Sequence, residues 1–286
     1  MTERVLIVGA GQVGRGLFRA FRASGIEVLG LHGRRPSGWT TSNGALPASL
    51  SQANTVVVAV GDDQIDDAIA ELINERGTGS RGRLAGGTVI LHTSGSAEPE
   101  LVPRLGEFDL GGGTFHPLVP FANPERAPEL LRRAWIGIDG DDQAKGTSRR
   151  LAGHIGARTL DIPPGGKGAY HAAAVMSSNF PVILAALAAD LLAGLGVPQR
   201  SAEQAVHSLM EGAVANLADV TAEEALTGPV ARGDAAAVLR HLASLRSEPE
   251  ARAVYKRLSL AALDLAARRG VDPARLEELK RVLLLR

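Results

Sequence analysis

The junction between the first apolar run and the glycine-rich turn after it constrains the fold of this chain more than any other feature. Residues 4–9 (RVLIVG) are almost continuously apolar, as expected of a parallel strand covered on both faces. The run leads into Gly9-Ala10-Gly11-Gln12-Val13-Gly14, a complete G-x-G-x-x-G, and helical spacing of apolar residues follows over residues 12–24. A strand, this loop and a helix in that order predict the first βαβ unit of a dinucleotide-binding domain.

Each glycine of the motif has a steric role in such a unit. Gly9 permits the tight turn, Gly11 lets the backbone approach a pyrophosphate, and Gly14 allows close packing of helix on sheet. The helix N-terminus adds unpaired N–H groups and the positive end of its dipole. The motif therefore predicts phosphate binding, and a glycine-rich turn without a ligand is the alternative. The predicted phosphate-binding residues are Gly9, Ala10, Gly11, Gln12, Val13 and Gly14.

The end of the second predicted strand (residues 26–31) indicates which nucleotide binds. An NAD site usually places Asp or Glu about 20 residues after the glycine motif, to hold the ribose 2′-hydroxyl. Residues 31–36 read LHGRRP and contain no acid. Arg34 and Arg35, which follow Gly33, could instead hold a 2′-phosphate by paired hydrogen bonds and stack on adenine. This favours NADP; a solvated loop with two surface arginines is the alternative.

Strands and helices continue to alternate through the first half of the chain. Further strands are predicted at residues 55–60, 88–91, 113–115, 135–138 and 159–162. This order predicts an α/β Rossmann domain with a doubly wound, mostly parallel sheet. The loops after its strands should complete the cofactor site with Val60, Gly61, Asp62, Thr93 and Ser94. Asp62 has the alternative role of capping the next helix.

The second half of the chain shows no strand pattern after residues 163–166 (PPGG). Residues 167–195 predict one long helix, apolar on all sides, and further helices are predicted at residues 201–217, 234–245, 249–267 and 273–285. We therefore predict two domains, residues 1–164 for NADP binding and an all-α domain, residues 165–286, for substrate binding and dimerisation. Because a helix that is apolar all round must be covered, a homodimer through the helical domain is expected.

The start of the long helix carries the predicted chemistry. Lys167 and His171 lie on one helical face, with Tyr170 beside them. Hydride transfer needs a proton donor or acceptor at the substrate, and Lys, His or Tyr can serve once neighbours tune the pKa. We expect Lys167 or His171 to be the acid/base. The residues expected to orient the substrate are Ser94, His116 and Asn179. The alternative is that His171 and Asn179 are hydrogen-bonded core side chains and that Lys167 reaches solvent at the start of the helix.

Composition excludes several other classes of protein. Lys plus Arg and Asp plus Glu each number 31, so net charge gives no case for nucleic-acid binding. The chain has no cysteine, which excludes disulfides and thiolate metal sites, and its histidines form no metal-binding pair. No signal-peptide pattern opens the chain, and the long helix is interrupted by Ser177, Ser178, Asn179 and Pro181. A cytoplasmic protein with a buried helix, rather than a membrane span, is expected.

These segments resemble the superfamily that contains ketopantoate reductase, 6-phosphogluconate dehydrogenase and pyrroline-5-carboxylate reductase. They are more closely similar to an uncharacterised bacterial branch of Rossmann-like oxidoreductases with a C-terminal domain of unknown function. The resemblance implies NADP binding and a helical dimerising domain. The wider superfamily often has Lys followed four residues later by Asn, which implies acid/base work for Lys167, whereas His171 stands at the Asn position. The matching segments are residues 9–14, 92–95 (HTSG), 116–118 (HPL), 167–178 and 226–234 (LTGPVARGD).

The sequence thus predicts an NADP-dependent oxidoreductase that transfers a hydride between NADPH and a small keto or imino acid. Two alternatives are open at this point. One is a non-catalytic NADP-binding sensor or scaffold that dimerises through its helical domain, and the other is an oxidoreductase that also uses a deazaflavin.

Overall fold

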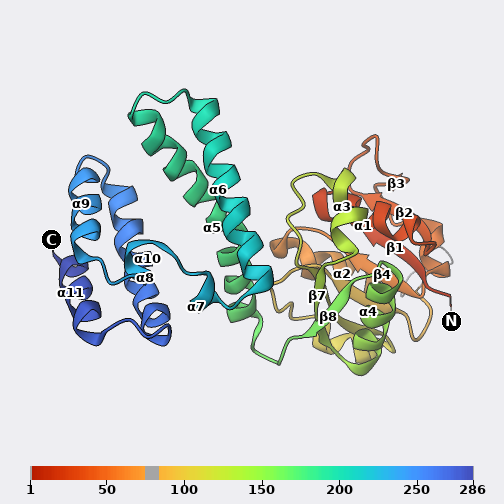
Figure 1. Cartoon of the computed structure of the whole chain (residues 1–286). Helices are drawn as coiled ribbons and strands as arrows, with labels where there is room; N and C mark the ends of the chain where they lie inside the picture. The colour runs from red at the N-terminus through yellow and green to blue at the C-terminus, as the bar shows by residue number, and fades with distance from the viewer. Residues whose placement is uncertain (1, 75–83, 286) are drawn as a thin grey trace. The chain divides into compact units, whose positions relative to one another are not determined.

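The computed structural model describes residues 2–74 and 84–285, which form two compact units, residues 1–178 and 179–286 (Figure 1). The predicted domain boundary after residue 164 follows the change from strands to helices. The division by packing falls at Ser178 and Asn179 instead, so that the first turns of the long helix pack with the sheet.

The first unit is built on one sheet, which in the described residues has eight strands in the order β3-β2-β1-β4-β5-β6-β7-β8. All neighbouring strands are parallel except β6 and β7, which confirms the predicted doubly wound α/β fold. The strands are β1 (Arg4–Val8), β2 (Glu27–Gly33), β3 (Ser42–Asn43), β4 (Thr55–Val58), β5 (Val89–His92), β6 (Gly111–Pro117), β7 (Trp135–Gly140) and β8 (Arg158–Asp161).

Helices cover both faces of this sheet. Alternate residues of β1 point to opposite faces, so Val5 and Ile7 enter one apolar core and Leu6 enters the other. The first core also contains Phe21 and Phe115, whose rings meet edge to face with centroids 6.0 Å apart. It is closed by α1 (Gln12–Ala23), α3 (Ala127–Leu131) and α4 (Asp142–His154), and the second core is closed by α2 (Ile65–Asn74).

The second unit is helical, as predicted. The sequence did not predict the short helices α7 and α8 of this unit, nor strand β3 of the first unit. Each has only two to four residues, too few to show a periodic pattern of apolar residues. Two apolar clusters hold the unit, one between α5 and α6 and one among α8 to α11. The helices are α5 (Lys167–Gly194), α6 (Gln199–Asp219), α7 (Ala222–Ala225), α8 (Gly228–Ala231), α9 (Ala235–Ser244), α10 (Pro249–Arg268) and α11 (Pro273–Leu284).

Helix α5 runs through Pro181 without a break, but the prediction that it is buried is wrong for the single chain. Phe180, Val182 and Ile183 are each more than half exposed. Sequence periodicity shows that a helix is apolar, not what covers it. Among the described residues α5 is also the one helix long and apolar enough to cross a membrane, which is weak evidence because core helices of soluble proteins pass the same test.

Candidate functional site

The glycine loop between β1 and α1 has the geometry that the motif predicts. Gly9 has a φ of +112°, and a side chain there would collide with the carbonyl of Ala59 at the end of β4. A side chain at Gly14 would collide with the carbonyl of Gly9. These two glycines are therefore required by packing within the protein.

Gly11 differs from both, because a Cβ atom placed there would meet no atom within 4 Å. Its φ of −72° is ordinary for any residue, so neither strain nor packing requires glycine. Gly11 is also the N-cap of α1, and no side chain caps that helix end. The N–H groups of the first turn therefore have no side-chain cap, which leaves them available to an anion at the helix N-terminus.

A hollow of about 800 Å³ runs along the carboxyl edge of the sheet from this loop. This volume is typical of sites for small molecules and cofactors. Of the predicted cofactor residues, the hollow is lined by Gly9, Ala10, Gly11, Gly33, Arg34, Arg35, Val60 and Gly61. The other six predicted cofactor residues do not line it; they are Gln12, Val13, Gly14, Asp62, Thr93 and Ser94.

The two arginines after β2 lie where the sequence places them. Arg34 and Arg35 are exposed and line the same hollow as the glycine loop. Two further charged side chains also line it, Arg15 from α1 and Glu71 from α2. Sequence reasoning missed both, because each belongs to the solvent-facing pattern of its helix. The hollow is therefore cationic around the predicted 2′-phosphate position, with one carboxylate in its wall.

The loop after β5 is fixed by its own polar side chains. Ser94 Oγ accepts hydrogen bonds from the backbone N–H groups of Ser96 and Ala97, at 3.2 and 2.9 Å. Asp62 accepts a hydrogen bond of 2.8 Å from Ser96 Oγ, and the N-cap of its own short 3-10 turn (Asp62–Gln64) is Gly61. The alternative capping role of Asp62 is therefore wrong. Asp62 instead joins the loop after β4 to the loop after β5.

Lys167 is buried beside this loop, with only 4% of the residue exposed. Its ammonium donates a 2.9 Å hydrogen bond to the carbonyl oxygen of Ala97 and lies 3.2 Å from His92 Nε2. Burial lowers the pKa of Lys167. The alternative that Lys167 reaches solvent is therefore wrong, and the side chain is anchored between β5 and its following loop.

His92 is the partner of Lys167 that sequence reasoning missed. It is 1% exposed, and its Nε2 also lies 3.0 Å from Thr114 Oγ1. Burial, reinforced by the charge of Lys167, lowers the pKa of His92 to about 3, so its ring is neutral and Nε2 accepts from the ammonium. The available signal was a polar residue that ends an apolar strand at the carboxyl edge of the sheet.

A second pair forms between β6 and α5. Tyr170 OH lies 2.7 Å from His116 Nδ1. Burial raises the pKa of Tyr170 to about 12, so the phenol stays protonated and donates a hydrogen bond to His116 Nδ1. Burial, with the nearby His171, lowers the pKa of His116 to about 4, so the ring is neutral. A neutral imidazole that accepts at Nδ1 carries its own proton at Nε2.

His171 lies beside this pair, with its ring centroid 5.8 Å from that of His116. Its Nδ1 is buried and has no hydrogen-bond partner among the described residues. A Cβ atom on Gly95 would lie 2.7 Å from His171 Nδ1 and 2.8 Å from His116 Nε2. Gly95 therefore packs closely against both imidazole rings, and a side chain there would collide with them.

Of the residues predicted for catalysis, the first unit thus brings together Ser94, His116, Lys167 and His171. Asn179 begins the second unit and is exposed there, so the alternative that it is a hydrogen-bonded core side chain is wrong.

The lowered pKa values of His92 and His116 predict that the fold is sensitive to acid. The unfolded histidines titrate near 6.5, so as the pH falls below this value the unfolded state takes up protons that the folded state does not. Between pH 6.5 and 5.5 we expect the free energy of unfolding to fall by about 1 kcal/mol for each histidine. Urea unfolding at the two pH values measures this change. The variant His116→Asn should show a shallower pH dependence, and an unchanged slope would contradict the buried neutral state of His116.

Residues 134–262 match the family model described as a domain of unknown function, DUF2520. The match begins just before β7, within the first unit, and includes Lys167, Tyr170 and His171. It confirms the resemblance to Rossmann-like oxidoreductases with a C-terminal domain of unknown function. No curated protein matches the sequence.

Solved structures share the fold of this chain over nearly its whole length. A candidate NADP oxidoreductase from Bacteroides fragilis is 19% identical, with a TM-score of 0.70 over 91% of this chain and 97% of that one. A protein from Thermotoga maritima is 24% identical, with a TM-score of 0.66 over 92% and 98%. Pyrroline carboxylate reductase from Plasmodium falciparum, solved with NADP bound, is 14% identical, with a TM-score of 0.59 over 98% of each chain. At these identities the likeness shows a common fold.

Proposed function

We propose that this protein is an NADP-dependent oxidoreductase that reduces a small keto or imino acid. The observation that carries the proposal is the open space at Gly11, next to a capless helix end and in the same hollow as Arg34 and Arg35. The names of similar structures, an NADP oxidoreductase and a pyrroline carboxylate reductase, support the same class of reaction.

The residues present fit the cofactor. The N–H groups of the first turn of α1 would bind the pyrophosphate, and Gly11 would let it approach the backbone. Arg34 and Arg35 would bind the 2′-phosphate, which Arg recognises by paired hydrogen bonds. NADPH supplies a hydride when it is bound. The side chains near Gly95 would supply the proton that must accompany the hydride.

His116 is the side chain best prepared to contact the substrate oxygen or nitrogen. The Tyr170 hydroxyl holds its Nδ1, so the Nε2–H of the neutral ring is a fixed donor beside Gly95. A neutral imidazole N–H polarises a carbonyl or imine without the desolvation penalty of a buried cation. We assign His116 to polarise the substrate and His171, with its unpartnered Nδ1, to exchange the proton.

Lys167 and Ser94 have more limited roles in this arrangement. Two acceptors, the Ala97 carbonyl and His92 Nε2, hold the ammonium of Lys167 and leave one N–H for a substrate carboxylate. Ser94 uses its oxygen to shape the loop, so only its hydroxyl hydrogen is free to orient the substrate. Asn179 is assigned to substrate orientation from sequence alone.

A turnover screen tests the proposed reaction. Purified protein is incubated with NADPH and, one at a time, with 2-keto acids, cyclic imino acids and simple cyclic imines, while the absorbance of NADPH is followed. We expect NADPH oxidation with at least one keto or imino acid, and slower or no oxidation with the uncharged imines. Tight NADPH binding without turnover in any arm would instead support the non-catalytic sensor.

We also propose that the protein is soluble, cytoplasmic and a homodimer through its helical unit. Helices α5 and α6 expose large apolar side chains, each of them more than half exposed: Val182, Ile183, Leu209, Val214 and Leu217. A monomeric protein rarely exposes so much apolar surface to water. An apolar hollow of about 460 Å³ between α5 and α10 extends this surface.

Sedimentation or light scattering measures the oligomeric state. We expect a mass of about twice the 29.8 kDa of the chain. The double variant Val182→Glu and Leu209→Glu should sediment as a folded monomer, whereas Arg200→Glu, an exposed change at the start of α6, should leave the dimer intact. A native protein that is monomeric at micromolar concentration would contradict the dimer.

A further inference from the structure

The helical unit contains a basic hollow that the proposed reaction does not use. It lies beside α10, has a volume of about 650 Å³ and falls in the size range of small-molecule sites. Four cationic side chains line it and none of its lining residues is acidic: Arg246, Arg252, Lys256 and Arg257. All of its residues belong to the second unit, so the hollow is complete without the Rossmann unit.

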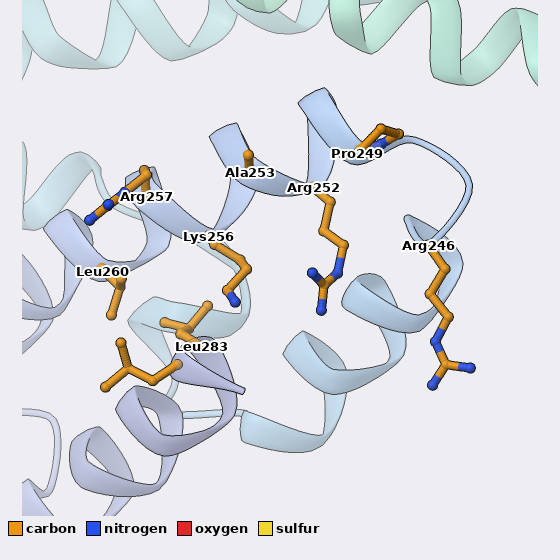
Figure 2. A pocket seen from close by; sticks show the side chains of 9 residues that line it. Arg246, Pro249, Arg252, Ala253, Lys256, Arg257, Leu260 and Leu283 are labelled. Carbon is orange, nitrogen blue, oxygen red and sulfur yellow. The ribbon is translucent and has the colours of Figure 1, made fainter. Parts of the chain in front are cut away.

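The cations come from two elements. Figure 2 shows Arg252 and Lys256 projecting from the same side of α10 toward Leu283, with Arg246 on the loop that precedes the helix. Arg257 points away from Lys256 in this view. Arg252 and Lys256 are one helical turn apart, a spacing at which like charges destabilise a helix. No ion pair within the described residues offsets this repulsion.

The Nε–H of Arg252 is a second and independent sign of a missing partner. This nitrogen is buried and makes no hydrogen bond within the described residues. A buried donor without an acceptor is unfavourable, and few such groups occur in folded proteins. An anion bound to the guanidinium would supply the missing acceptor once Nε turns toward the hollow.

Lys256 is already held in place. Its ammonium donates a 2.6 Å hydrogen bond to the carbonyl oxygen of Leu285, at the end of α11. This bond satisfies one of the unpaired carbonyls of the helix terminus and leaves two N–H groups of the ammonium for a ligand. The charge of Lys256 is therefore fixed at the edge of the hollow before any ligand binds.

The rest of the lining is apolar. Leu260 lies one further turn along the same side of α10, and Leu283 is fully buried beneath it. The hollow thus has a cationic end and an apolar end. A phosphate, with a charge near −2, suits three cations better than a single carboxylate does, and Arg binds its oxygens in pairs.

We propose that this hollow is a binding site for a small organic phosphate, with the phosphate on Arg252, Lys256 and Arg246 and the apolar part on Leu260 and Leu284, an exposed residue that also lines the hollow. The site is separate from the proposed NADP site and does not depend on it.

The test uses phenyl phosphate as the probe and the arginine Nε–Hε signals of the full-length ¹⁵N-labelled protein as the readout. The signal of Arg252 is identified by its loss in Arg252→Gln. We expect that signal to shift saturably with phenyl phosphate, and to respond several-fold more weakly to inorganic phosphate, which lacks the apolar part, and to benzoate, which lacks the second charge. An Arg252 signal that does not move would overturn the proposal.

Variants separate this site from general charge effects. Arg246→Gln, on a loop where folding is not at risk, should weaken phenyl phosphate binding about tenfold, which corresponds to one charge-assisted hydrogen bond. Arg240→Gln removes an exposed charge of α9 outside the hollow and should change nothing. The double variant Arg34→Ala and Arg35→Ala should leave the Arg252 response intact. Equal weakening by Arg240→Gln and Arg246→Gln would show non-specific attraction only and overturn the site.

Discussion

Replacing Gly11 by valine is expected to lower the affinity for NADPH by about 100-fold or more while the protein stays folded. The backbone at Gly11 suits any residue, and a side chain there would project into open space. The two methyl groups of the valine would occupy the volume that the pyrophosphate needs at the first turn of α1. Calorimetric titration with NADPH measures the loss. Urea unfolding should show a change of no more than about 1 kcal/mol, the scale of a change at a helix N-cap.

Gly14→Val is the matched control for this substitution. The same side chain at Gly14 would collide with the carbonyl of Gly9, so the loop itself must shift and the protein should lose stability. Gly11 is therefore needed for nucleotide binding, and Gly14 is needed for the packing of the loop. Normal NADPH binding by Gly11→Val would contradict the placement of the pyrophosphate.

The second large effect is expected at His116. Removing its ring in His116→Ala should lower kcat by about 100- to 1000-fold, the usual loss when one fixed donor to a developing negative charge is removed. KM should change little, because the donor acts mainly when the substrate oxygen or nitrogen gains charge. Steady-state kinetics with the substrate found in the turnover screen measures both constants.

Tyr170→Phe tests whether Tyr170 fixes the Nε2–H tautomer of His116 or only helps to hold the fold together. The ring is kept, but His116 Nδ1 loses its donor, so the Nε2–H form is no longer enforced. We expect kcat to fall about tenfold, within the range for a positioned proton-transfer group. The ¹⁵N spectrum of His116 should change from the Nε2–H tautomer to a mixture, a readout that needs no substrate. His154→Ala, an exposed change on α4, is the control. Full turnover by His116→Ala would show that His116 takes no part in the reaction.

The Rossmann unit was predictable because its signals are local. The apolar run before Gly9, the glycine spacing and the arginines after β2 are each recognisable within a few residues. One hollow is lined by Val8, Gly9, Gly11, Arg34 and Arg35. The doubly wound architecture follows from the alternation of strands and helices along the chain.

The partners in the buried cluster were not predictable, because they depend on side chains that are far apart in the chain. Lys167 meets His92 across 75 residues, and Tyr170 meets His116 across 54. The sequence shows that each residue is polar in an apolar setting, but not which partner satisfies it. The exposure of α5 was unpredictable for a related reason, since periodicity does not show whether the covering surface comes from the same chain.

The most direct test of the central claim is a calorimetric titration of nucleotide-free protein with NADPH and, separately, with NADH. Paired hydrogen bonds from Arg34 and Arg35 to the 2′-phosphate should favour NADPH by about 1.5–3 kcal/mol, roughly 10- to 100-fold in Kd. The double variant Arg34→Ala and Arg35→Ala should lose this preference and keep its affinity for NADH. Equal binding of the two nucleotides by the native protein would contradict the 2′-phosphate site, and binding of neither would contradict the proposed function.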